Sequence, residues 1–522
     1  MGEPAVTEAP PIPNGAERSA AENATAQRRR IVDRHGVTLA TNLKTFELYF
    51  DADLQPHAED RREAAAAIAR RFPGLDQRQL AEKFLAGGTS LVTRPATPRQ
   101  VQAARDLGLP GMYARERFDR IFPMGRETVH LLGKIGIDGD GLAGIEAALD
   151  ETLSEESEHP LRLSLDLRAQ RAVREELANG IAAFKAKAGS AIVLDAKTGE
   201  IAALVSLPDY DPTDPPKPPA TWEEAEQSPL YSRAVAGRYE LGSVFKVFTW
   251  ALALEAEVAL PHDTFPAPKP FRVAGHVIRD DHPIRQPVSF GEAFARSSNI
   301  VAASLALNAG RPAQFDMFEA LGLHVETSVE LAEARGKAPF WHEPWTRSTT
   351  AATAYGHAVA VTPLHLASAV ASIINGGTRV SPTLLLRDEE AETSPPARVV
   401  STETSAVLRD LMRMVVTDGT GRRAAVVGLD VGGKTGTAEK PAPSGGYYDD
   451  RVMASFVAAF PMEDPAYVVL VTLDEPVEET QSLPRRSAGL TAAPVTGAVI
   501  RRVAPLLGVV PSSPALPTSE IR

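Results

Sequence analysis

Residues 240–250 have the sequence ELGSVFKVFTW, and the apolar run that begins inside this stretch continues to Leu254. A helix that is apolar on every side has to be buried on every side, so we expect this segment to run through the middle of a domain. Gly242 interrupts the pattern just before the helix, which places Ser243 in its first turn. Lys246 follows three residues later on the same helix face, so its amine can reach the hydroxyl. The pattern indicates a serine nucleophile activated by a lysine at the N-terminal end of a buried helix.

The Ser-x-x-Lys pattern is weak by itself, because it arises by chance in long chains. Residues 243–246 are its only occurrence in this chain, which adds some weight. The chemical interpretation therefore depends on what the rest of the chain supplies.

The composition is that of an ordinary globular protein, and it excludes several functions. The chain has 522 residues, enough for two or three domains with sizeable cores. Its formal net charge of −12 argues against a nucleic-acid-binding surface. It has no cysteine, which excludes disulfides, thiolate metal sites and cysteine catalysis. We find no signal peptide and no apolar run long enough to span a bilayer, and we predict no cofactor or metal site.

Changes in composition and periodicity divide the chain into four parts. Residues 1–27 are small, polar and aperiodic, and we expect them to be disordered. Residues 28–158 form a first domain, in which no catalytic group is recognisable. Residues 159–509 form a second, larger domain, and residues 510–522 are expected to be a flexible tail.

The first domain is expected to mix strands and helices. We predict strands and turns at 31–40 (a hairpin that turns at His35-Gly36), 45–50 and 117–153, and helices at 58–85, with a break at 72–74, and at 97–107. The loop at 138–146 is rich in glycine and aspartate but lacks the ligand spacing of a calcium loop. We expect it to lead into a helix.

The second domain is expected to alternate between strands and helices. We predict a helix from Asp166 to about Ala188, strands at 190–194 and 200–206, helices at 290–321, 363–374 and 402–417, strands at 431–437, 452–460 and 466–473, and a final helix at 494–507. This order suits an α+β fold, in which an antiparallel five-stranded sheet carries helices on both faces.

Two further motifs follow the Ser243 helix. Ser297-Ser298-Asn299 is expected to be a loop between helices, where a hydroxyl and an amide can relay a proton and hold a carbonyl. Lys434-Thr435-Gly436-Thr437 opens a strand that can pair with a peptide backbone, and its glycine permits close approach. Lys197-Thr198-Gly199 repeats part of the second motif, but it lies in a predicted hairpin turn ahead of Ser243 and is expected to be a decoy.

Taken in order, Ser-x-x-Lys, Ser-x-Asn and Lys-Thr-Gly form the motif set of penicillin-binding proteins and class A β-lactamases. From Arg30 onward the chain resembles a class B penicillin-binding protein, most of all the septal, cell-division type of Gram-negative bacteria. The pieces that show the resemblance are residues 30–36, 138–146, 207–212, 355–357, 362–363 and 433–440. It implies an elongated mixed α/β pedestal, the dimerisation-type domain of that family, followed by a transpeptidase domain of the penicillin-binding and serine β-lactamase type.

The resemblance also implies a role for each residue of the three motifs. Ser243 would be the acylated nucleophile, and Lys246 would accept its proton. Ser297 and Asn299 would shuttle protons and bind the donor peptide, while Lys434 would support the two serines. Because a lysine acts as a base only when neutral, burial and the nearby Lys434 are expected to lower the pKa of Lys246.

The same resemblance assigns substrate binding to the predicted strand. Thr435 and Thr437 would hold the terminal carboxylate of the substrate, with Gly436 between them. The backbone N–H groups of Ser243 and Thr437 would form the oxyanion hole. Two departures from the family pattern are modest: Leu241 stands where many relatives have proline, and Ser298 stands where the motif has aspartate.

Partners and location are likewise implied by the resemblance. They are peptidoglycan stem peptides, β-lactam antibiotics, a separate membrane glycosyltransferase of the SEDS type and other division proteins, at the periplasmic face of the inner membrane. The family carries an N-terminal membrane helix, and this chain shows none. Either that helix lies in sequence outside this chain, or this form is soluble.

The predicted function is a peptidoglycan D,D-transpeptidase that acts through an acyl-serine intermediate. The nearest alternative is a serine β-lactamase or β-lactam sensor, which needs a dedicated base for deacylation. Asp280, Asp281 and Glu292 are interpreted as loop or cap residues, and Glu439 is the best remaining candidate for such a base. The alternative from another class is a non-catalytic division scaffold, which would have no reason to keep all the motif residues.

Overall fold

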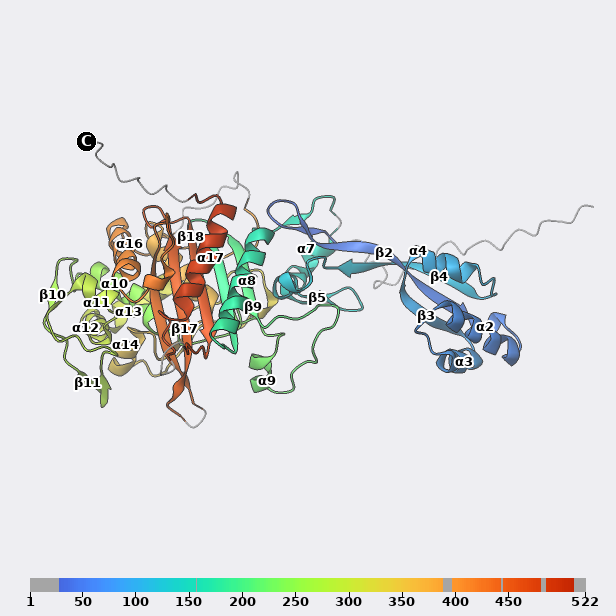
Figure 1. Cartoon of the computed structure of the whole chain (residues 1–522), viewed down its shortest axis with the longest axis horizontal. Coiled ribbons are helices and arrows are strands. Elements are labelled where there is room, and N and C mark those ends of the chain that lie inside the picture. The colour runs from blue at the N-terminus through green and yellow to red at the C-terminus, as the bar shows by residue number, and fades with distance from the viewer. Residues whose placement is uncertain (1–27, 156, 388–396, 443–444, 480–484, 511–522) are drawn as a thin grey trace, which may run out of the picture.

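The computed structural model describes residues 28–510 except 156, 388–396, 443–444 and 480–484. The tails predicted at 1–27 and 510–522 lie outside this range, except for residue 510. Figure 1 shows an elongated molecule, in which a narrow first domain projects from a larger second domain. Over the residues described, every helix is too short or too polar to cross a lipid bilayer.

The second domain is built on one five-stranded antiparallel sheet. Its order is β16 (Gly432–Pro441), β17 (Tyr447–Phe460), β18 (Tyr467–Asp474), β8 (Ala188–Asp195) and β9 (Ile201–Leu207). Side chains alternate between the two faces of a strand, and β8 shows this division. Its Ala191 and Val193 belong to one hydrophobic core, whereas Ile192 and Leu194 belong to the other. The predicted α+β sheet with two covered faces is confirmed.

Different helices cover the two faces of this sheet. One face carries α8 (Leu167–Ala183) and α17 (Ala492–Leu506), which lie side by side in Figure 1. On the other face lie α10 (Lys246–Glu255), α11 (Phe290–Ala295), α12 (Asn299–Ala309), α13 (Arg311–Ala320), α14 (Arg347–Thr353), α15 (Pro363–Ile374) and α16 (Thr402–Thr417). As predicted, α10 is central, since every residue from Lys246 to Ala253 is buried. Its first turn differs from the prediction, because Ser243 lies in a 3₁₀ helix (Gly242–Phe245) that precedes α10.

Short elements complete the second domain. They are β7 (Leu161–Arg162), α9 (Trp222–Gln227), β10 (Thr264–Phe265), β11 (Phe271–Val273), β12 (His276–Ile278), β13 (Val288–Ser289), 3₁₀ helix η4 (Ala332–Ala334), β14 (Phe340–Trp341), β15 (Val359–Ala360) and 3₁₀ helix η5 (Arg422–Ala424). Several predicted boundaries were wrong, most of all those of α8 and β17. Helix α8 ends at Ala183, because Lys185 turns the chain at φ +50° before β8 begins. Strand β17 begins at Tyr447, earlier than predicted, because it continues the hairpin with β16.

The first domain is organised around one long strand, β2 (Thr38–Asp51). It pairs with β1 (Ile31–Val32), β3 (Thr89–Ala96) and β4 (Met112–Ile121). The predicted hairpin at 31–40 is confirmed, with Gly36 at φ +86° in the turn. The separate strand predicted at 45–50 was wrong, since those residues continue β2. Strand β3 was not predicted.

Helices and short strands surround this ribbon. They are η1 (Ala52–Leu54), α2 (Ala58–Arg71), α3 (Gln77–Leu85), α4 (Pro98–Arg105), η2 (Gly125–Glu127), α5 (Val129–Leu132), β5 (Lys134–Ile135), β6 (Gly141–Ala143), α6 (Gly144–Ala148) and α7 (Asp150–Ser154). The predicted helix break at 72–74 is confirmed, and Thr97 caps α4 in a capping box with Gln100. The loop at 138–146 leads into α6, as predicted.

The side chains of the first domain belong to two different cores. Those of its distal end, including Phe50, Ile68 and Phe84, form a core of their own. Those near its base, including Ile31 and Ile145, are part of the large core that contains α10. The base of the pedestal is therefore packed as part of the second domain.

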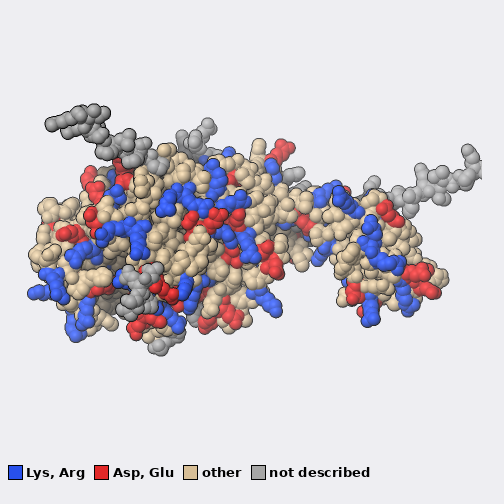
Figure 2. Space-filling view, in the orientation of Figure 1, with Lys and Arg blue, Asp and Glu red and all other residues tan. Residues whose placement is uncertain are grey.

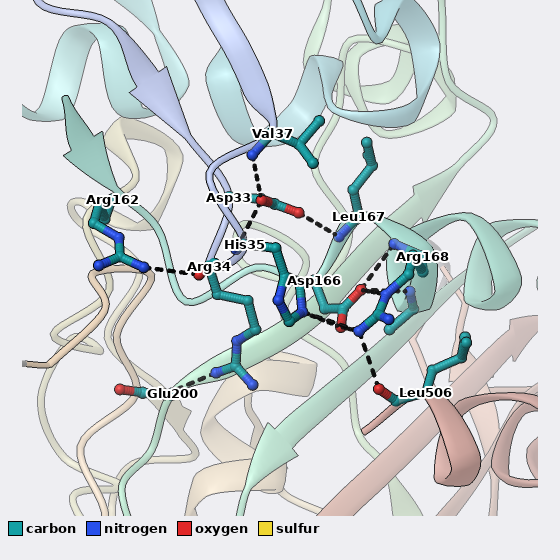
Figure 3. A network of polar contacts seen from close by, with 11 residues as sticks. Asp33, Arg34, His35, Val37, Arg162, Asp166, Leu167, Arg168, Glu200 and Leu506 are labelled. Carbon is teal, nitrogen blue, oxygen red and sulfur yellow. Dashed lines mark hydrogen bonds and ion pairs between the residues drawn. The ribbon is translucent and has the colours of Figure 1, made fainter. Parts of the chain in front are cut away.

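A polar network joins the β1–β2 hairpin to the start of α8 (Figure 3). The carboxylate of Asp33 accepts the N–H groups of His35 and Val37 in its own turn and of Leu167 in α8. Asp166 caps α8 and lies between the side chains of His35 and Arg168. Although burial raises the pKa of Asp166, hydrogen bonds from Arg168 and His35 outweigh it and lower that pKa to about 2. The network therefore fixes the pedestal to the catalytic domain through an ionised carboxylate.

Candidate active site

Four segments of the second domain bring four of the predicted residues together. Ser243 lies in the 3₁₀ turn before α10, Lys246 is the first residue of α10, Ser297 lies between α11 and α12, and Lys434 lies on β16. The Lys246 Nζ atom is 3.0 Å from Ser243 Oγ and 3.0 Å from Ser297 Oγ. The Lys434 Nζ atom is 3.0 Å from the same Ser297 Oγ. Ser297 therefore connects the two lysines, and Lys246 connects the two serines.

The position of Lys246 favours a neutral amine. Its side chain is fully buried, and burial lowers its pKa to about 7 against the opposing charges of Asp281 and Asp280. Its Nζ atom also lies 2.6 Å from both the Ser297 carbonyl oxygen and Asn299 Oδ1. An ammonium has three hydrogens for these four oxygen neighbours, whereas a neutral amine has two and a free lone pair. The neutral form can therefore donate to two oxygens and accept the proton of Ser243.

Lys434 is the second fully buried lysine of the site. Burial lowers its pKa well below the usual value, and the positive charge of Lys246 lowers it further. Its Nζ atom also donates to the Thr435 carbonyl oxygen at 3.2 Å. We had expected Lys434 to lower the pKa of Lys246. Burial, the other cause that we predict, accounts for that lowering, whereas the positive charge of Lys246 lowers the pKa of Lys434.

The Ser297-Ser298-Asn299 loop is held in a strained conformation. Ser297 has φ +60°, in the left-handed region that residues with a side chain rarely adopt, and such strain often lies at functional sites. Asp280 holds the loop, since both of its carboxylate oxygens accept from Ser298 Oγ at 3.0 Å and one accepts from the N–H of Ile300. The amide of Asn299 donates to the Arg279 carbonyl oxygen at 3.1 Å. Asp280 is a positioning residue that places Ser297 between the lysines.

Strand β16 is an edge strand and lies against the turn that contains Ser243. A methyl group on Gly436 would be 2.2 Å from the Leu241 carbonyl oxygen, and one on Gly242 would be 2.8 Å from the Thr437 carbonyl oxygen. Glycine at these two positions is what allows backbone to approach backbone. The contact places the backbone of Leu241 and Gly242 against that of Gly436 and Thr437.

The threonines of β16 are oriented by neighbours that the sequence analysis missed. Thr435 Oγ1 lies 2.7 Å from Thr420 Oγ1, and Thr437 Oγ1 accepts from the N–H of Ala488 at 3.0 Å. Both neighbours are far from the motifs in sequence and belong to no periodic pattern. Only the tertiary structure identifies them.

A cleft of about 900 Å³ opens at this site. Its lining residues are Ser243, Asp280, Asp281, His282, Arg296, Ser297, Gly419, Thr420, Arg422, Arg423, Thr435, Thr437, Arg485, Arg486, Ser487, Gly489 and Leu490. The fully buried Lys246 and Lys434 are not among these residues, but they contact Ser243 and Ser297, which are. The volume is in the range of sites that bind small molecules and short peptides.

The other candidates lie elsewhere or have structural partners. Lys197 lies in the β8–β9 turn and pairs with Asp464, as expected of a decoy. Glu292 forms a capping box with Ser289 at the start of α11, as predicted. Glu439 is exposed on β16 and is not among the residues that line the cleft.

Comparisons with known proteins match both domains of the chain. Residues 189–501 match the penicillin binding protein transpeptidase domain, and residues 23–158 match the penicillin-binding protein dimerisation domain. The chain is 35% identical over 500 residues to a probable peptidoglycan D,D-transpeptidase FtsI of Caulobacter vibrioides, covering 94% of this chain and 83% of that protein. It is 27% identical over 530 residues to peptidoglycan D,D-transpeptidase FtsI of Escherichia coli K12, covering 94% and 86% respectively.

A solved structure has the same fold. Penicillin binding protein 3 of Mycobacterium tuberculosis, in complex with aztreonam, is similar with a TM-score of 0.70 and 24% identity, over 94% of this chain and 97% of that one. The domain boundary predicted at 158/159 remains a prediction. The two domain matches and the extended similarity to the Caulobacter protein show that the chain belongs to the class B penicillin-binding proteins and has the transpeptidase and dimerisation domains of that family.

Proposed function

We propose that this protein is a serine D,D-transpeptidase, which cross-links peptidoglycan stem peptides during septal wall synthesis and is acylated by β-lactams. One observation supports this proposal above all others. A nucleophilic hydroxyl, a buried lysine whose pKa burial lowers to about 7, a bridging serine and a second buried lysine are joined by contacts of 3.0 Å beside an edge strand.

Acylation follows from this arrangement. The Ser243 Oγ atom attacks the carbonyl carbon of the penultimate D-alanine of the donor stem, and its proton passes to the neutral Lys246 Nζ atom. The N–H groups of Ser243 and Thr437 stabilise the negative charge on the carbonyl oxygen, and one such donor typically contributes about 10²–10³ in rate. Ser297 lies within 3.0 Å of Lys246 and relays a proton to the leaving amine of the terminal D-alanine. The peptide bond breaks, and an ester on Ser243 remains.

Deacylation reverses the proton path. The amine of a neighbouring stem attacks the ester carbonyl, loses a proton to the Lys246 and Ser297 relay, and forms the cross-link as the Ser243 hydroxyl is restored. Strand β16 would align the donor backbone along its free edge, with Thr435 and Thr437 holding the terminal carboxylate and Gly436 permitting the approach.

The β-lactamase and scaffold alternatives are less well supported. Hydrolysis needs a carboxylate or similar base that can position water against the ester. Of the two carboxylates that line the cleft, Asp280 is engaged by Ser298 and Ile300, and Asp281 faces the buried lysines as a counter-charge. A scaffold would not need two lysines desolvated around one serine, since burying such groups is costly.

The partners and location belong to the same proposal. We infer that a membrane glycosyltransferase of the SEDS type makes the glycan strands, because the chain's first domain matches a dimerisation domain. The complex would work with other division proteins at the periplasmic face of the inner membrane. A mixture of both enzymes with lipid-linked precursor should yield cross-linked glycan, and penicillin should leave glycan that is polymerised but not cross-linked.

Covalent labelling tests the catalytic assignment. The full chain should form a 1:1 adduct with a fluorescent penicillin, and peptide mass spectrometry should place that adduct on Ser243. Ser243→Ala should fold with the same melting temperature and take no label. An adduct on another serine of the Ser243→Ala variant would overturn the assignment of the nucleophile.

A further inference from the structure

A carboxylate that the transpeptidase mechanism does not use lies three residues before the nucleophile. The side chain of Glu240 is 12% exposed, and it is not among the residues that line the catalytic cleft. Figure 2 shows the Asp and Glu side chains of the visible face mixed with Lys and Arg side chains on the surface. Glu240 has a different environment, because no lysine or arginine of the described part of the chain forms an ion pair with it.

Three donors from two distant segments bond to the carboxylate oxygens of Glu240. One oxygen accepts the N–H of Ala358 at 3.0 Å, and the other accepts from His357 Nδ1 at 2.9 Å. The hydroxyl of Tyr447, at the start of β17, donates to the same carboxylate at 3.0 Å. Burial and the negative charge of Glu240 raise the pKa of Tyr447, so this hydroxyl keeps its proton as a donor. A single side chain therefore joins the turn of the nucleophile, the loop at 355–358 and the β16–β17 hairpin.

The backbone on each side of Glu240 contacts the same part of the chain. Before it, Tyr239 and Val361 exchange two backbone hydrogen bonds, at 2.9 and 3.0 Å. After it, the N–H of Gly242 donates to the Gly356 carbonyl oxygen at the longer distance of 3.3 Å. The Glu240 side chain adds its hydrogen bonds between these two contacts and strengthens the attachment near the nucleophile.

The loop needs such an attachment because part of it is strained. Ala358 has φ +60°, in the left-handed region that residues with a side chain rarely adopt. Such conformations cost about 1–3 kcal/mol each and persist only where the surrounding structure holds them. The Glu240 carboxylate accepts the N–H group of this strained residue. Loss of the carboxylate should let the loop relax and displace Gly356, which is bonded to Gly242 beside Ser243.

We propose that Glu240 is a positioning residue for acylation, which holds the turn of Ser243 against the 355–358 loop and the β16–β17 hairpin in the geometry of attack. It acts through the position of the backbone and touches neither the substrate nor the reacting atoms. A misplacement of about 1 Å can cost about 100-fold in rate, so the effect belongs to the bond-forming step rather than to substrate binding. The proposal rests on the proposed function, because it takes Ser243 as the nucleophile.

Stopped-flow acylation of the full chain over a range of penicillin concentrations tests the proposal. It separates the dissociation constant of the initial complex from the rate constant of ester formation. Glu240→Ala should lower that rate constant at least about 30-fold and change the dissociation constant less than about threefold. The final amount of label should stay at one adduct per chain on Ser243, whereas a loss of folded protein would reduce it.

A milder variant tests the contact to the hairpin. Tyr447 is 46% exposed, so Tyr447→Phe removes one hydroxyl without opening the core. It should slow ester formation about fivefold, as expected for the loss of one hydrogen bond. In a protein that already carries Glu240→Ala, the same change should have no further effect, because the two side chains act through one contact.

Glu240→Gln tests whether geometry or charge matters. Its amide oxygen can accept from Ala358 and Tyr447, and its amide nitrogen can donate to His357 in the other tautomer. Because the hydrogen bonds are kept, ester formation should stay within about fivefold of the rate in the unchanged protein. A loss as large as that of Glu240→Ala would contradict a positioning role.

Glu330→Ala is the matched control. Glu330 is also partly buried, and its carboxylate accepts from Thr383 Oγ1 at 2.7 Å and from the N–H of Leu384 at 2.8 Å. None of these three residues lines the catalytic cleft. This variant should lower the melting temperature but leave the rate constant of ester formation unchanged.

Three further results would overturn the proposal. The first is an unchanged rate constant in Glu240→Ala while Ser243 still takes the label. The second is an equal decrease in Glu330→Ala, which would assign the effect to general destabilisation. The third is a change in the dissociation constant alone, which would make Glu240 a ligand-binding residue. Failure of the unchanged chain to form an adduct on Ser243 would overturn the proposed function, and this proposal with it.

Discussion

The N–H group of Gly242 donates to the carbonyl oxygen of Gly356 at 3.3 Å, and a methyl group on Gly356 would lie 2.0 Å from the carbonyl oxygen of Gly242. The turn that presents Ser243 is thus in contact with a loop more than one hundred residues later in the chain. This contact excludes a side chain at Gly356. The position of the nucleophile therefore depends on the Tyr355-Gly356-His357 loop as well as on its own helix.

Gly356→Ala should abolish penicillin acylation, because the added methyl group displaces the backbone next to Ser243. Gly36→Ala is the matched control, since Gly36 has φ +86°, close to the +84° of Gly356, and nothing within 4 Å of an added methyl group. Gly36→Ala should lose about 1–2 kcal/mol through left-handed strain. Gly356→Ala should lose more, because its methyl group also meets the Gly242 backbone. Stopped-flow acylation should separate them, and equal acylation rates would show that the Gly242–Gly356 contact does not place the nucleophile.

The acylation rate should depend on the protonation of Lys246. The base must be neutral, and burial sets its pKa at about 7, so the rate should rise with pH through 7 and level off above it. At pH 6 the rate should be about one tenth of the plateau value, because about one amine in ten is neutral. The measurement is fluorescent-penicillin acylation from pH 5.5 to 9. A flat profile, or one that falls over this range, would exclude Lys246 as the base.

Asp281→Asn should move the pH profile of the acylation rate to lower pH. The carboxylate of Asp281 raises the pKa of Lys246 against the larger effect of burial, so its removal leaves the amine neutral at a lower pH. The plateau rate should change little, which distinguishes this effect from general damage to the site. Asp60→Asn on the pedestal helix α2 serves as the control. If the midpoint of the pH profile stays in place or rises, then the carboxylate of Asp281 does not raise the pKa of Lys246.

Two Lys-Thr-Gly sequences give a direct test of which lysine is catalytic. Lys434→Met should reduce acylation at least about 100-fold, since it removes a buried proton donor next to Ser297. Lys197→Met should leave acylation within about twofold and stability within about 0.5 kcal/mol, because Lys197 is 55% exposed and pairs on the surface. Comparable losses in both variants would mean that the third motif has been misplaced.

The penicilloyl adduct should persist for many minutes. Asp280 is engaged by Ser298 and Ile300, Asp281 acts as a counter-charge to Lys246, and Glu439 lies outside the cleft. Acylation followed by dilution into drug-free buffer measures the release, and Glu439→Gln should leave it unchanged. Release within seconds, slowed strongly by Glu439→Gln, would identify a β-lactamase.

Most of the fold and the motif residues of the site could be predicted because their signals are local. The run from Val244 to Leu254 is apolar on all sides, and it forms the buried helix α10. Strand β3 was missed because it contains Arg94, Pro95 and two threonines, and such a half-exposed edge strand has no hydrophobic period. The continuity of β2 was missed because Asn42 and Lys44 interrupt its alternation.

The residues that position the catalytic groups could not be predicted in the same way. Asp280 precedes Ser298 by 18 residues and belongs to a segment without period. Nothing in the local sequence distinguishes it from a loop aspartate, which is how it was interpreted. Thr420 and Ala488 act through one hydrogen bond each, and only the tertiary structure brings them to β16.

The division of the pedestal between two hydrophobic cores has a consequence for how the protein unfolds. The distal core around Phe50 and Phe84 contains no side chain of the second domain, whereas Ile31 and Ile145 share the core of α10. On heating, the residues around the distal core should therefore unfold as one small cooperative unit. The second domain and the base of the pedestal should unfold together as a larger unit. A protein that begins at residue 159, and so lacks the whole first domain, would expose the apolar surface that Ile31 and Ile145 cover. A protein that lacks only the residues around the distal core would keep the core of α10 covered.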